Sequence, residues 1–223
     1  MRTRQPIRRR EALVALGAGV AGLYGLRTQL GDEPAAAASC LLQREVTEGP
    51  YYLDLDLVRR NVRRGRSGTP LTLRFKVVDA TTCRPIPGAA VEIWHADAAG
   101  VYSGVAGNSG NFLRGTQRAD SHGNVRFESI VPGWYPGRTP HVHMKVFVSG
   151  DEVHTGQVFF RATALRAVYA QGVYKSRGQA DTSNGSDGIY GAAGSRALLA
   201  MKRKGTAVSS GYTGSLTVGV RPS

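Results

Sequence analysis

Leu71-Thr-Leu-Arg-Phe-Lys-Val-Val78 is the stretch of sequence that decides the fold. Apolar and polar side chains alternate along it, and this period of two is typical of a β-strand with one face in a core and the other in solvent. The pattern therefore predicts a half-buried strand, and a strand of this kind needs partners that cover its apolar face.

Similar segments follow along the chain, separated by turns that are rich in glycine and proline. The sequence predicts strands at 89–95, 124–130, 141–148 and 154–160, short late edge strands at 196–204 and 215–220, and one brief helix near 163–169. The polar segment 178–188 is predicted to be a surface loop. Many short strands with little helix predict an all-β fold, an antiparallel β-sandwich with long loops.

The first 38 residues have the order of segments that is typical of an export signal. A basic cluster at 8–10 precedes an apolar run at 12–26, and small residues end in a cleavage site after Ala38. The arginine pair resembles the twin-arginine type of signal, and an ordinary signal peptide is the alternative. The apolar run is shorter than the ~20 residues of a membrane-spanning helix, so we expect no stable membrane span.

We therefore predict an exported protein, secreted or otherwise extracytoplasmic, with three segments. These are a signal peptide at 1–38, an N-terminal arm at 39–70 and one β-sandwich domain at 71–223.

The net charge is strongly positive, with 29 Lys and Arg against 16 Asp and Glu, which gives +13. Residues 1–38 hold six of the basic and three of the acidic residues, so a mature chain keeps a net charge of +10. The basic residues are scattered and form no motif interleaved with aromatic residues. We predict a solvated basic surface and no nucleic-acid partner, and the oligomeric state stays open.

The chain has two cysteines, Cys40 and Cys83. In an oxidising compartment such a pair predicts a disulfide, and closing a loop of roughly 44 residues would contribute on the order of 4 kcal/mol. A lipid anchor on Cys40 is the alternative. Ala37 stands where a lipid-attachment motif prefers leucine, which disfavours it.

The segment most informative about chemistry is Pro132-Gly-Trp-Tyr-Pro-Gly-Arg-Thr-Pro-His-Val-His143. His141 and His143 are two residues apart on a predicted strand, so both side chains point to one face, while apolar residues fill the other. Two imidazoles on one face can bind a metal, and a pair of surface polar residues is the alternative. Tyr135 lies six residues upstream in a loop that can fold its phenol toward the imidazoles.

A phenol is an unusual ligand because its pKa is near 10. A hard, highly charged ion such as iron(III) can bind it as phenolate. Two neutral imidazoles and two phenolates would leave iron(III) with a net charge of about +1, which suits the ferric state and leaves room for an anionic oxygen ligand.

Three motifs resemble the intradiol ring-cleavage dioxygenases, a family that includes protocatechuate 3,4-dioxygenases and catechol 1,2-dioxygenases. They are Glu48-Gly-Pro-Tyr-Tyr52, Val91-Glu-Ile-Trp-His-Ala-Asp-Ala-Ala-Gly-Val-Tyr-Ser-Gly104 and Gly133-Trp-Tyr-Pro-Gly-Arg-Thr-Pro-His-Val-His143, in the family's order. The likeness is to the exported single-domain branch, which lacks the helical dimerisation segment of the cytoplasmic catechol enzymes. It implies a non-haem iron(III) enzyme, with one ion per chain, that inserts both atoms of O2 into a catechol-type diol and yields a cis,cis-muconate-type dicarboxylate.

The resemblance also implies the residues of the site. The metal ligands it implies are Tyr102, Tyr135, His141 and His143. In the family the second tyrosine leaves the metal when substrate binds, so Tyr135 is the candidate base for a catechol proton. Arg138 matches the arginine that stabilises negative charge on the activated substrate, and Gln157 matches a polar residue beside it. We expect Arg138, Gln157 and Tyr51 to contact the substrate.

The other histidines, His95, His122 and His154, match no metal position and are interpreted as structural or surface residues. Each candidate ligand also has a structural alternative, as a packed loop aromatic or a surface polar group. Two other functions stay open. One is a copper-dependent oxidase, which needs a third histidine, for which His95 and His154 are candidates, or a soft ligand. The other is an exported aromatic-binding β-sandwich without turnover.

Overall fold

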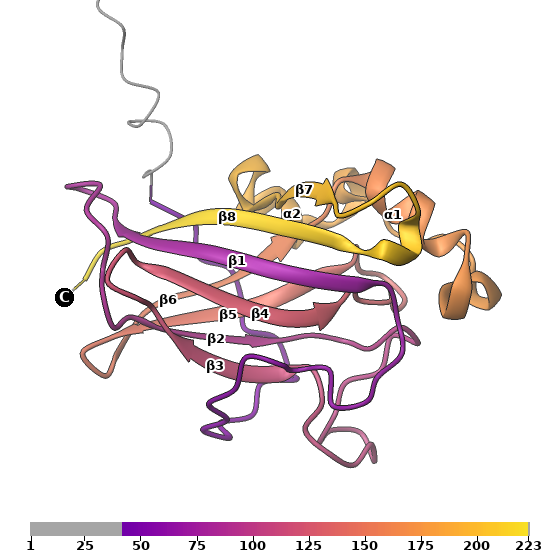
Figure 1. The fold of residues 1–223 in the computed structure, drawn as a ribbon, viewed down its shortest axis with the longest axis horizontal. Coiled ribbons are helices and arrows are strands. Elements are labelled where there is room, and N and C mark those ends of the chain that lie inside the picture. Colours follow the sequence, from indigo (N-terminus) through magenta and orange to yellow (C-terminus); the bar gives the residue numbers. More distant parts are fainter. Residues whose placement is uncertain (1–41, 223) are drawn as a thin grey trace, which may run out of the picture. The chain divides into compact units, whose positions relative to one another are not determined.

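The computed structural model describes residues 42–222, which form two four-stranded sheets and a group of short helices beside β7 and β8 (Figure 1). The first sheet has the order β4-β1-β8-β7 and the second the order β3-β2-β5-β6. The strands are β1 (Pro70–Asp79), β2 (Ala90–Trp94), β3 (Arg114–Arg118), β4 (Asn124–Ile130), β5 (His141–Val148), β6 (Asp151–Phe159), β7 (Ala200–Arg203) and β8 (Tyr212–Val220). The helices are α1 (Ala162–Tyr169), α2 (Gly188–Ala193) and the 3-10 helices η1 (Gly172–Arg177), η2 (Asn184–Ser186), η3 (Ser195–Ala197) and η4 (Val208–Ser210).

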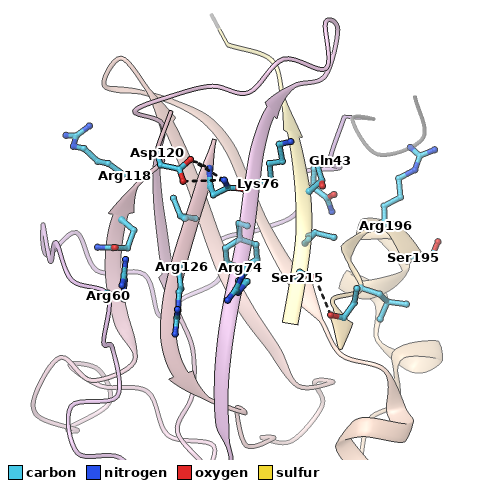
Figure 2. Close-up of a pocket in the computed structure, with 18 residues that line it drawn as sticks. Gln43, Arg60, Arg74, Lys76, Arg118, Asp120, Arg126, Ser195, Arg196 and Ser215 are labelled. Atoms are coloured by element: carbon cyan, nitrogen blue, oxygen red, sulfur yellow. Dashed lines mark hydrogen bonds between the residues drawn. The ribbon is translucent and has the colours of Figure 1, made fainter. Parts of the chain in front are cut away.

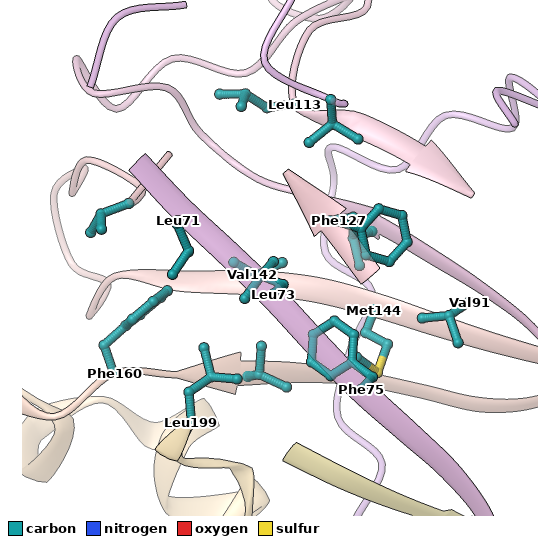
Figure 3. Close-up of a cluster of buried hydrophobic side chains, with 14 of the residues drawn as sticks. Leu71, Leu73, Phe75, Val91, Leu113, Phe127, Val142, Met144, Phe160 and Leu199 are labelled. Atoms are coloured by element: carbon teal, nitrogen blue, oxygen red, sulfur yellow. The ribbon is translucent and has the colours of Figure 1, made fainter. Parts of the chain in front are cut away.

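The predicted β-sandwich is confirmed, and β1 shows why it forms. Leu71, Leu73 and Phe75 are 0–1% exposed and face the second sheet. Arg74 and Lys76, which alternate with them, are exposed and point to solvent. These side chains pack in one core between the sheets (Figure 3). Burial of alternate apolar residues from both sheets is the main stabilising contribution in a fold of this kind.

The last strand differs from the prediction. β8 lies inside the first sheet, between β1 and β7, and the expectation of an edge strand at 215–220 was wrong. It pairs with β1 in the parallel sense from Leu71↔Tyr212 to Asp79↔Val220, while the other strand pairs are antiparallel. Two parallel strands cannot be joined by a hairpin, and here β2 to β7 and the helical segment after β6 lie between β1 and β8 in the sequence. A short apolar pattern does not reveal that route.

Strand β3 was missed because its sequence, Arg-Gly-Thr-Gln-Arg, has no apolar alternation. Contacts with distant residues determine the position of β3. The strand pairs with β2, and the Arg114 guanidinium at its start is buried and donates to the carbonyl oxygen of Ser103 at 2.8 Å. Tertiary contacts thus override a weak local pattern.

Residues 42–69 begin beside β8 and end beside β4 of the first sheet, and between these ends they cross the outer face of the second sheet, the face opposite to the core. Their backbone is tied to the strands at several points, including Val46 N to Thr155 O at 3.1 Å and Arg59 N to Thr116 O at 3.1 Å. The arm therefore covers the face of β5 that carries the histidine pair.

Three predictions fall on residues outside the described range. The signal peptide, its cleavage site and the Cys40 half of the disulfide to Cys83 lie there, so each stays a prediction. Within residues 42–222, no helix is long and apolar enough to cross a membrane.

Candidate metal centre

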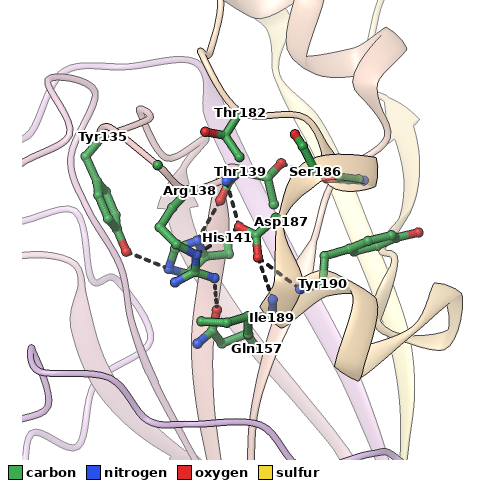
Figure 4. Close-up of polar contacts among 12 residues, drawn as sticks. Tyr135, Arg138, Thr139, His141, Gln157, Thr182, Ser186, Asp187, Ile189 and Tyr190 are labelled. Atoms are coloured by element: carbon green, nitrogen blue, oxygen red, sulfur yellow. Dashed lines mark hydrogen bonds and ion pairs between the residues drawn. The ribbon is translucent and has the colours of Figure 1, made fainter.

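Two phenol oxygens and two imidazole nitrogens converge beneath the arm. His143 Nε2 lies 3.0 Å from His141 Nε2 and 3.0 Å from Tyr102 Oη. His141 Nε2 lies 3.4 Å from Tyr102 Oη and 3.1 Å from Tyr135 Oη. The four side chains predicted as ligands therefore present their donor atoms to one small space, and Figure 4 shows Tyr135 and His141 in it.

Each histidine is held by the strand that carries it. His141 and His143 are 1–2% exposed on β5, and His141 Nδ1 lies 2.7 Å from the carbonyl oxygen of Thr139, which accepts its proton. The lone pair of His141 is thereby left on Nε2, pointing into the cluster. The His143 ring stacks on Trp94 at 4.9 Å between centroids, nearly parallel at 9°. Trp94, 1% exposed, forms a wall of the site.

Tyr102 lies near the middle of the long loop between β2 and β3. The Arg114 guanidinium donates to the main chain and hydroxyl of Ser103, the next residue, and Ser103 Oγ donates to Phe112 O at 2.7 Å. These buried hydrogen bonds close the loop upon itself. Tyr102, only 4% exposed, is fixed by its neighbour in the sequence.

Tyr135 lies in a second loop, which reaches the first because two glycines permit close backbone approach. A β-carbon on Gly133 would collide with the main chain of Asp97 and Ala98, and one on Gly100 with the carbonyl of Trp134. Gly133 N also donates to Asp97 O at 2.9 Å. The loops that carry the two tyrosines are thus locked together by residues with no side chain.

Burial sets the protonation of all four groups. It lowers the pKa of His141 to about 3, with the nearby Arg138 charge acting in the same direction, and it lowers the pKa of His143 well below the usual value. It raises the pKa of Tyr102 well above 10, and raises that of Tyr135 while Arg138 opposes the rise. In the metal-free chain the cluster is therefore two neutral imidazoles and two neutral phenols.

This donor set fits an ion of high charge. Ligand bonds of about 2.1 Å meeting at about 90° to 120° place neighbouring ligand atoms about 3.0 to 3.6 Å apart, and the observed separations are 3.0–3.4 Å. Both imidazole nitrogens that face the centre can offer a lone pair. Phenols with raised pKa values lose their protons most readily to a strongly charged cation, so the donor set suits an ion such as iron(III).

Tyr102 and Tyr135 differ in how tightly their rings are packed. Tyr102 is buried and stacked under Tyr51, with the ring centroids 4.4 Å apart. Tyr135 is half-buried, and Tyr51 meets it only edge-on at 6.1 Å. Tyr135 is therefore the phenol that can move without breaking the core, and Tyr51 lies against both rings.

Arg138 is oriented from two sides beside the cluster. Its Nε donates to Asp187 Oδ2 at 2.8 Å, and its terminal nitrogen donates to Gln157 Oε1 at 2.6 Å (Figure 4). Gln157 Nε2 in turn donates to the carbonyl oxygen of Thr47 in the arm at 2.9 Å. Arg138 and Gln157, both predicted to contact the substrate, are thus hydrogen-bonded to each other. The guanidinium group is held next to Tyr135 and His141.

Asp187 was missed by the sequence interpretation. The segment 178–188 is, as predicted, mostly an exposed loop, with one short 3-10 helix, and Asp187 is its buried residue. Its side chain is fully buried, and it accepts hydrogen bonds from the backbone nitrogens of Thr139, Ile189 and Tyr190 as well as from Arg138. Burial alone would raise its pKa, but these donors outweigh that effect and lower it. The one local signal is an aspartate immediately before a short helix, the usual N-cap position.

Asp187→Asn is expected to reduce turnover by roughly 10-fold or more while iron content stays at the wild-type level. The amide keeps the cap but leaves the half-buried Arg138 charge without a counter-ion, so the guanidinium loses its fixed direction. The turnover number kcat should fall by a larger factor than KM rises. A displaced guanidinium stabilises the transition state less, and it changes the stability of the substrate complex to a smaller extent. Asp181→Asn, in the same segment but exposed, is the matched control. Equal kinetics in both variants would contradict the role given to Asp187.

The remaining histidines are placed as interpreted. His95 is buried, with its ring nitrogens 2.7 Å from Ser129 Oγ and 2.8 Å from Ala96 O, His154 is buried, and His122 is exposed. Over the described residues 42–222, no three side chains of His, Cys, Asp or Glu form a group that could hold a metal. The third histidine that a copper site would need is not supplied by His95, because both its nitrogens are engaged.

A second polar cluster lies beneath the arm. Tyr52 donates to Glu92 Oε2 at 3.2 Å, and Lys145 Nζ lies 4.1 Å from the Tyr52 ring centroid and 2.7 Å from carboxylate oxygens of Glu48 and Glu152. Burial raises the pKa of Glu92 to about 7, although Tyr52 and Lys145 oppose the shift. A carboxyl group that holds its proton more tightly when folded stabilises the fold only while protonated.

Glu92→Gln is therefore expected to raise the stability above pH 7. The stabilising contribution of Glu92 is complete below about pH 4.5 and is lost as the pH rises through about 7, so the neutral amide should gain ~1 kcal/mol at pH 8 after screening, and little at pH 5. Urea unfolding of the variant and of wild type at both pH values measures this difference in the free energy of unfolding. A variant that is less stable than wild type at pH 8 would show that Glu92 is a well-paired carboxylate.

Comparison with known proteins agrees with this geometry. Residues 47–168 match the family model described as Dioxygenase. The chain is 30% identical over 135 residues to the chlorocatechol 1,2-dioxygenase of Pseudomonas putida, covering 51% of this chain and 52% of that one. It is 44% identical over 107 residues to the catechol 1,2-dioxygenase of Candida albicans, and the match covers 39% of this chain and 35% of that one. The chain thus spans about half the length, or less, of these curated relatives.

The fold comparison extends over more of the chain. The structure of an intradiol ring-cleavage dioxygenase from Tetranychus urticae superposes with a TM-score of 0.77 at 33% identity, over 82% of this chain and 96% of that one. The two-sheet fold, the match over residues 47–168 and these relatives together identify the class. The chain belongs to the intradiol ring-cleavage dioxygenase family.

Proposed function

We propose that this protein is an iron(III)-dependent dioxygenase that opens catechol rings between the two hydroxyl-bearing carbons. The observation that carries the proposal is the convergence of four donor atoms: His141 Nε2 lies 3.0–3.4 Å from the donor atoms of Tyr102, Tyr135 and His143, and His143 Nε2 lies 3.0 Å from Tyr102 Oη. Two phenols and two neutral imidazoles form a donor set for a ferric ion. The family relation supplies the reaction class. Both atoms of O2 enter the product, a cis,cis-muconate-type dicarboxylate, and no external reductant is needed.

When bound, iron(III) would act as a Lewis acid toward both hydroxyl oxygens of the catechol and make its ring reactive toward O2. The protein's part is to supply bases, charge and orientation. Tyr135 is suited to be the base, because its half-buried ring can turn out of the cluster and its phenolate oxygen can accept a proton from the incoming diol. Tyr102, clamped under Tyr51, stays in place.

Arg138 supplies a fixed positive charge beside Tyr135. Its orientation is set before substrate arrives, since Asp187 and Gln157 hold two of its nitrogens. A charge fixed in this way stabilises negative charge that develops on the ring oxygens without any reorganisation during the reaction. Gln157 is then primarily a positioning residue, and Tyr51 offers an aromatic wall against which a flat ring can lie.

Oxygen uptake by the iron-loaded protein tests the proposal. We expect one O2 consumed per catechol, a visible band in the resting protein from phenolate-to-iron charge transfer, and a shift of this band when catechol is added without oxygen. Hydroquinone, the 1,4-diol, is the matched control and should give neither uptake nor shift. Uptake only after loading with copper would support the oxidase alternative, and a spectral shift without uptake would support a binding protein without turnover.

We also propose that the protein is exported, through the signal at 1–38. Intact-mass measurement of protein recovered from outside the host cytoplasm should give a chain that starts at Ser39 and weighs two hydrogens less than its reduced form, because Cys40 and Cys83 are joined. Lipid on Cys40, or retention of residues 1–38, would contradict this proposal.

A further inference from the structure

A groove of about 880 Å³ crosses the outer face of the first sheet (Figure 2). It takes no part in the metal centre, which lies on the outer face of the other sheet. Six basic side chains line it, and we name it the basic groove. They are Arg60, Arg74, Lys76, Arg118, Arg126 and Arg196.

The positive charge in the basic groove is largely uncompensated. Arg126 pairs with Glu128 at 3.2 Å, and within residues 42–222 the other five basic side chains make no ion pair. The lining has one carboxylate, that of Asp120, which accepts hydrogen bonds from the backbone nitrogens of His122 and Asn124. The hydrogen bonds within its own turn occupy that carboxylate, and it forms no ion pair with the basic side chains of the groove.

A second observation points to a ligand at the same place. Gln43 lines the groove and is 5% exposed, and its side-chain nitrogen Nε2 is buried with no hydrogen-bond partner among the described residues. A buried amide donor without a partner destabilises the fold. An oxygen-rich ligand in the groove would accept this hydrogen bond once the Gln43 side chain turns its amide into the groove. Figure 2 places Gln43 beside β8, between Lys76 and Arg196.

The remaining lining narrows the class of ligand. Neutral amides and hydroxyls, such as Gln117, Ser215 and Thr217, stand between the charges. The one aromatic residue of the lining, Phe75, is 1% exposed and belongs to the core, so no ring is offered for stacking a base. The exposed large apolar residues lie elsewhere, so nothing in the groove would insert into a membrane.

We propose that the basic groove binds an anionic polysaccharide of the polyuronate class. Its carboxylates would pair with the arginine guanidinium groups, which match carboxylate geometry, and its hydroxyls would meet the amides and hydroxyls between them. The Gln43 amide would donate to a ligand oxygen. The groove holds the enzyme on a polymer while the metal centre on the other sheet stays open to small aromatic diols.

Calorimetric titration of the iron-loaded protein with oligogalacturonate tests the proposal. We expect saturable binding that weakens as salt is added, because exposed charges are screened. The double variant Arg74→Glu and Lys76→Glu should bind at least tenfold more weakly while it keeps its iron and its melting temperature. Gln43→Met, which removes only the amide, should weaken binding several-fold.

The matched control is Arg166→Glu with Lys175→Glu, which changes the net charge by the same amount on exposed residues of α1 and η1, away from the groove. It should bind like wild type. Equal weakening in both double variants would show attraction to net charge only, and equal binding of methyl-esterified oligogalacturonate would remove the role of carboxylates. Either result, or no binding at low salt, overturns the proposal. So does tighter groove-dependent binding of duplex DNA or of phosphatidylglycerol vesicles.

Discussion

Tyr102→Phe is expected to purify with less than a tenth of the iron found in wild type and to lose the visible colour. The substitution removes one of the two oxygen donors and leaves the ring, its stacking on Tyr51 and its burial unchanged. Removing even a partner of a metal ligand typically costs 10- to 100-fold in affinity, so removal of a ligand itself should cost at least ~10²-fold. His143→Ala should have an effect of the same size.

Tyr51→Phe is the control for this experiment, because it changes the neighbouring ring in the same way and removes no donor atom of the cluster. It should retain its full iron content. Iron analysis of protein loaded under identical conditions gives the comparison. If Tyr102→Phe retains both iron and colour, the assignment of the four ligands is wrong.

Arg138→Ala is expected to keep its iron and resting colour and still to show the spectral shift with catechol, while turnover falls by roughly 10²-fold or more. That is the usual scale for the loss of one preorganised electrostatic donor. The effect should lie in the step with O2, because the charge that Arg138 stabilises builds up after the substrate has bound. Tyr135→Phe differs in kind, since it should change the resting colour as well as the rate.

Rapid mixing of the preformed catechol complex of Arg138→Ala with O2 isolates that step. Arg166→Ala, an exposed residue of α1, is the control and should react like wild type. A wild-type rate for Arg138→Ala in this single turnover would mean that Arg138 has no part in the chemistry.

The strands with apolar alternation could be predicted from the sequence. β1, β4 and β5 are set by local pattern, and their observed bounds fall within two residues of the predicted ones. The same pattern places the histidines of β5 on the face opposite to the core residues Val142 and Met144. Alternate side chains of any strand point to opposite faces, so this assignment requires no knowledge of the rest of the chain.

Features that depend on distant contacts could not be predicted in this way. The pairing of β8 with β1 joins residues about 140 apart, and β3 is a strand because the buried Arg114 anchors it. Asp187 meets Arg138 across 49 positions of sequence. Nothing in the polar composition of 178–188 indicates that this carboxylate turns inward, because a buried ion pair is defined by its partner.

The most direct test of the central claim is the fate of oxygen in the reaction. Iron-loaded protein should convert catechol under oxygen-18 gas into cis,cis-muconate that carries both labelled atoms, one in each carboxylate. That product requires cleavage between the two hydroxylated carbons. A ring opened beside the diol, or an o-quinone without label, would contradict the account.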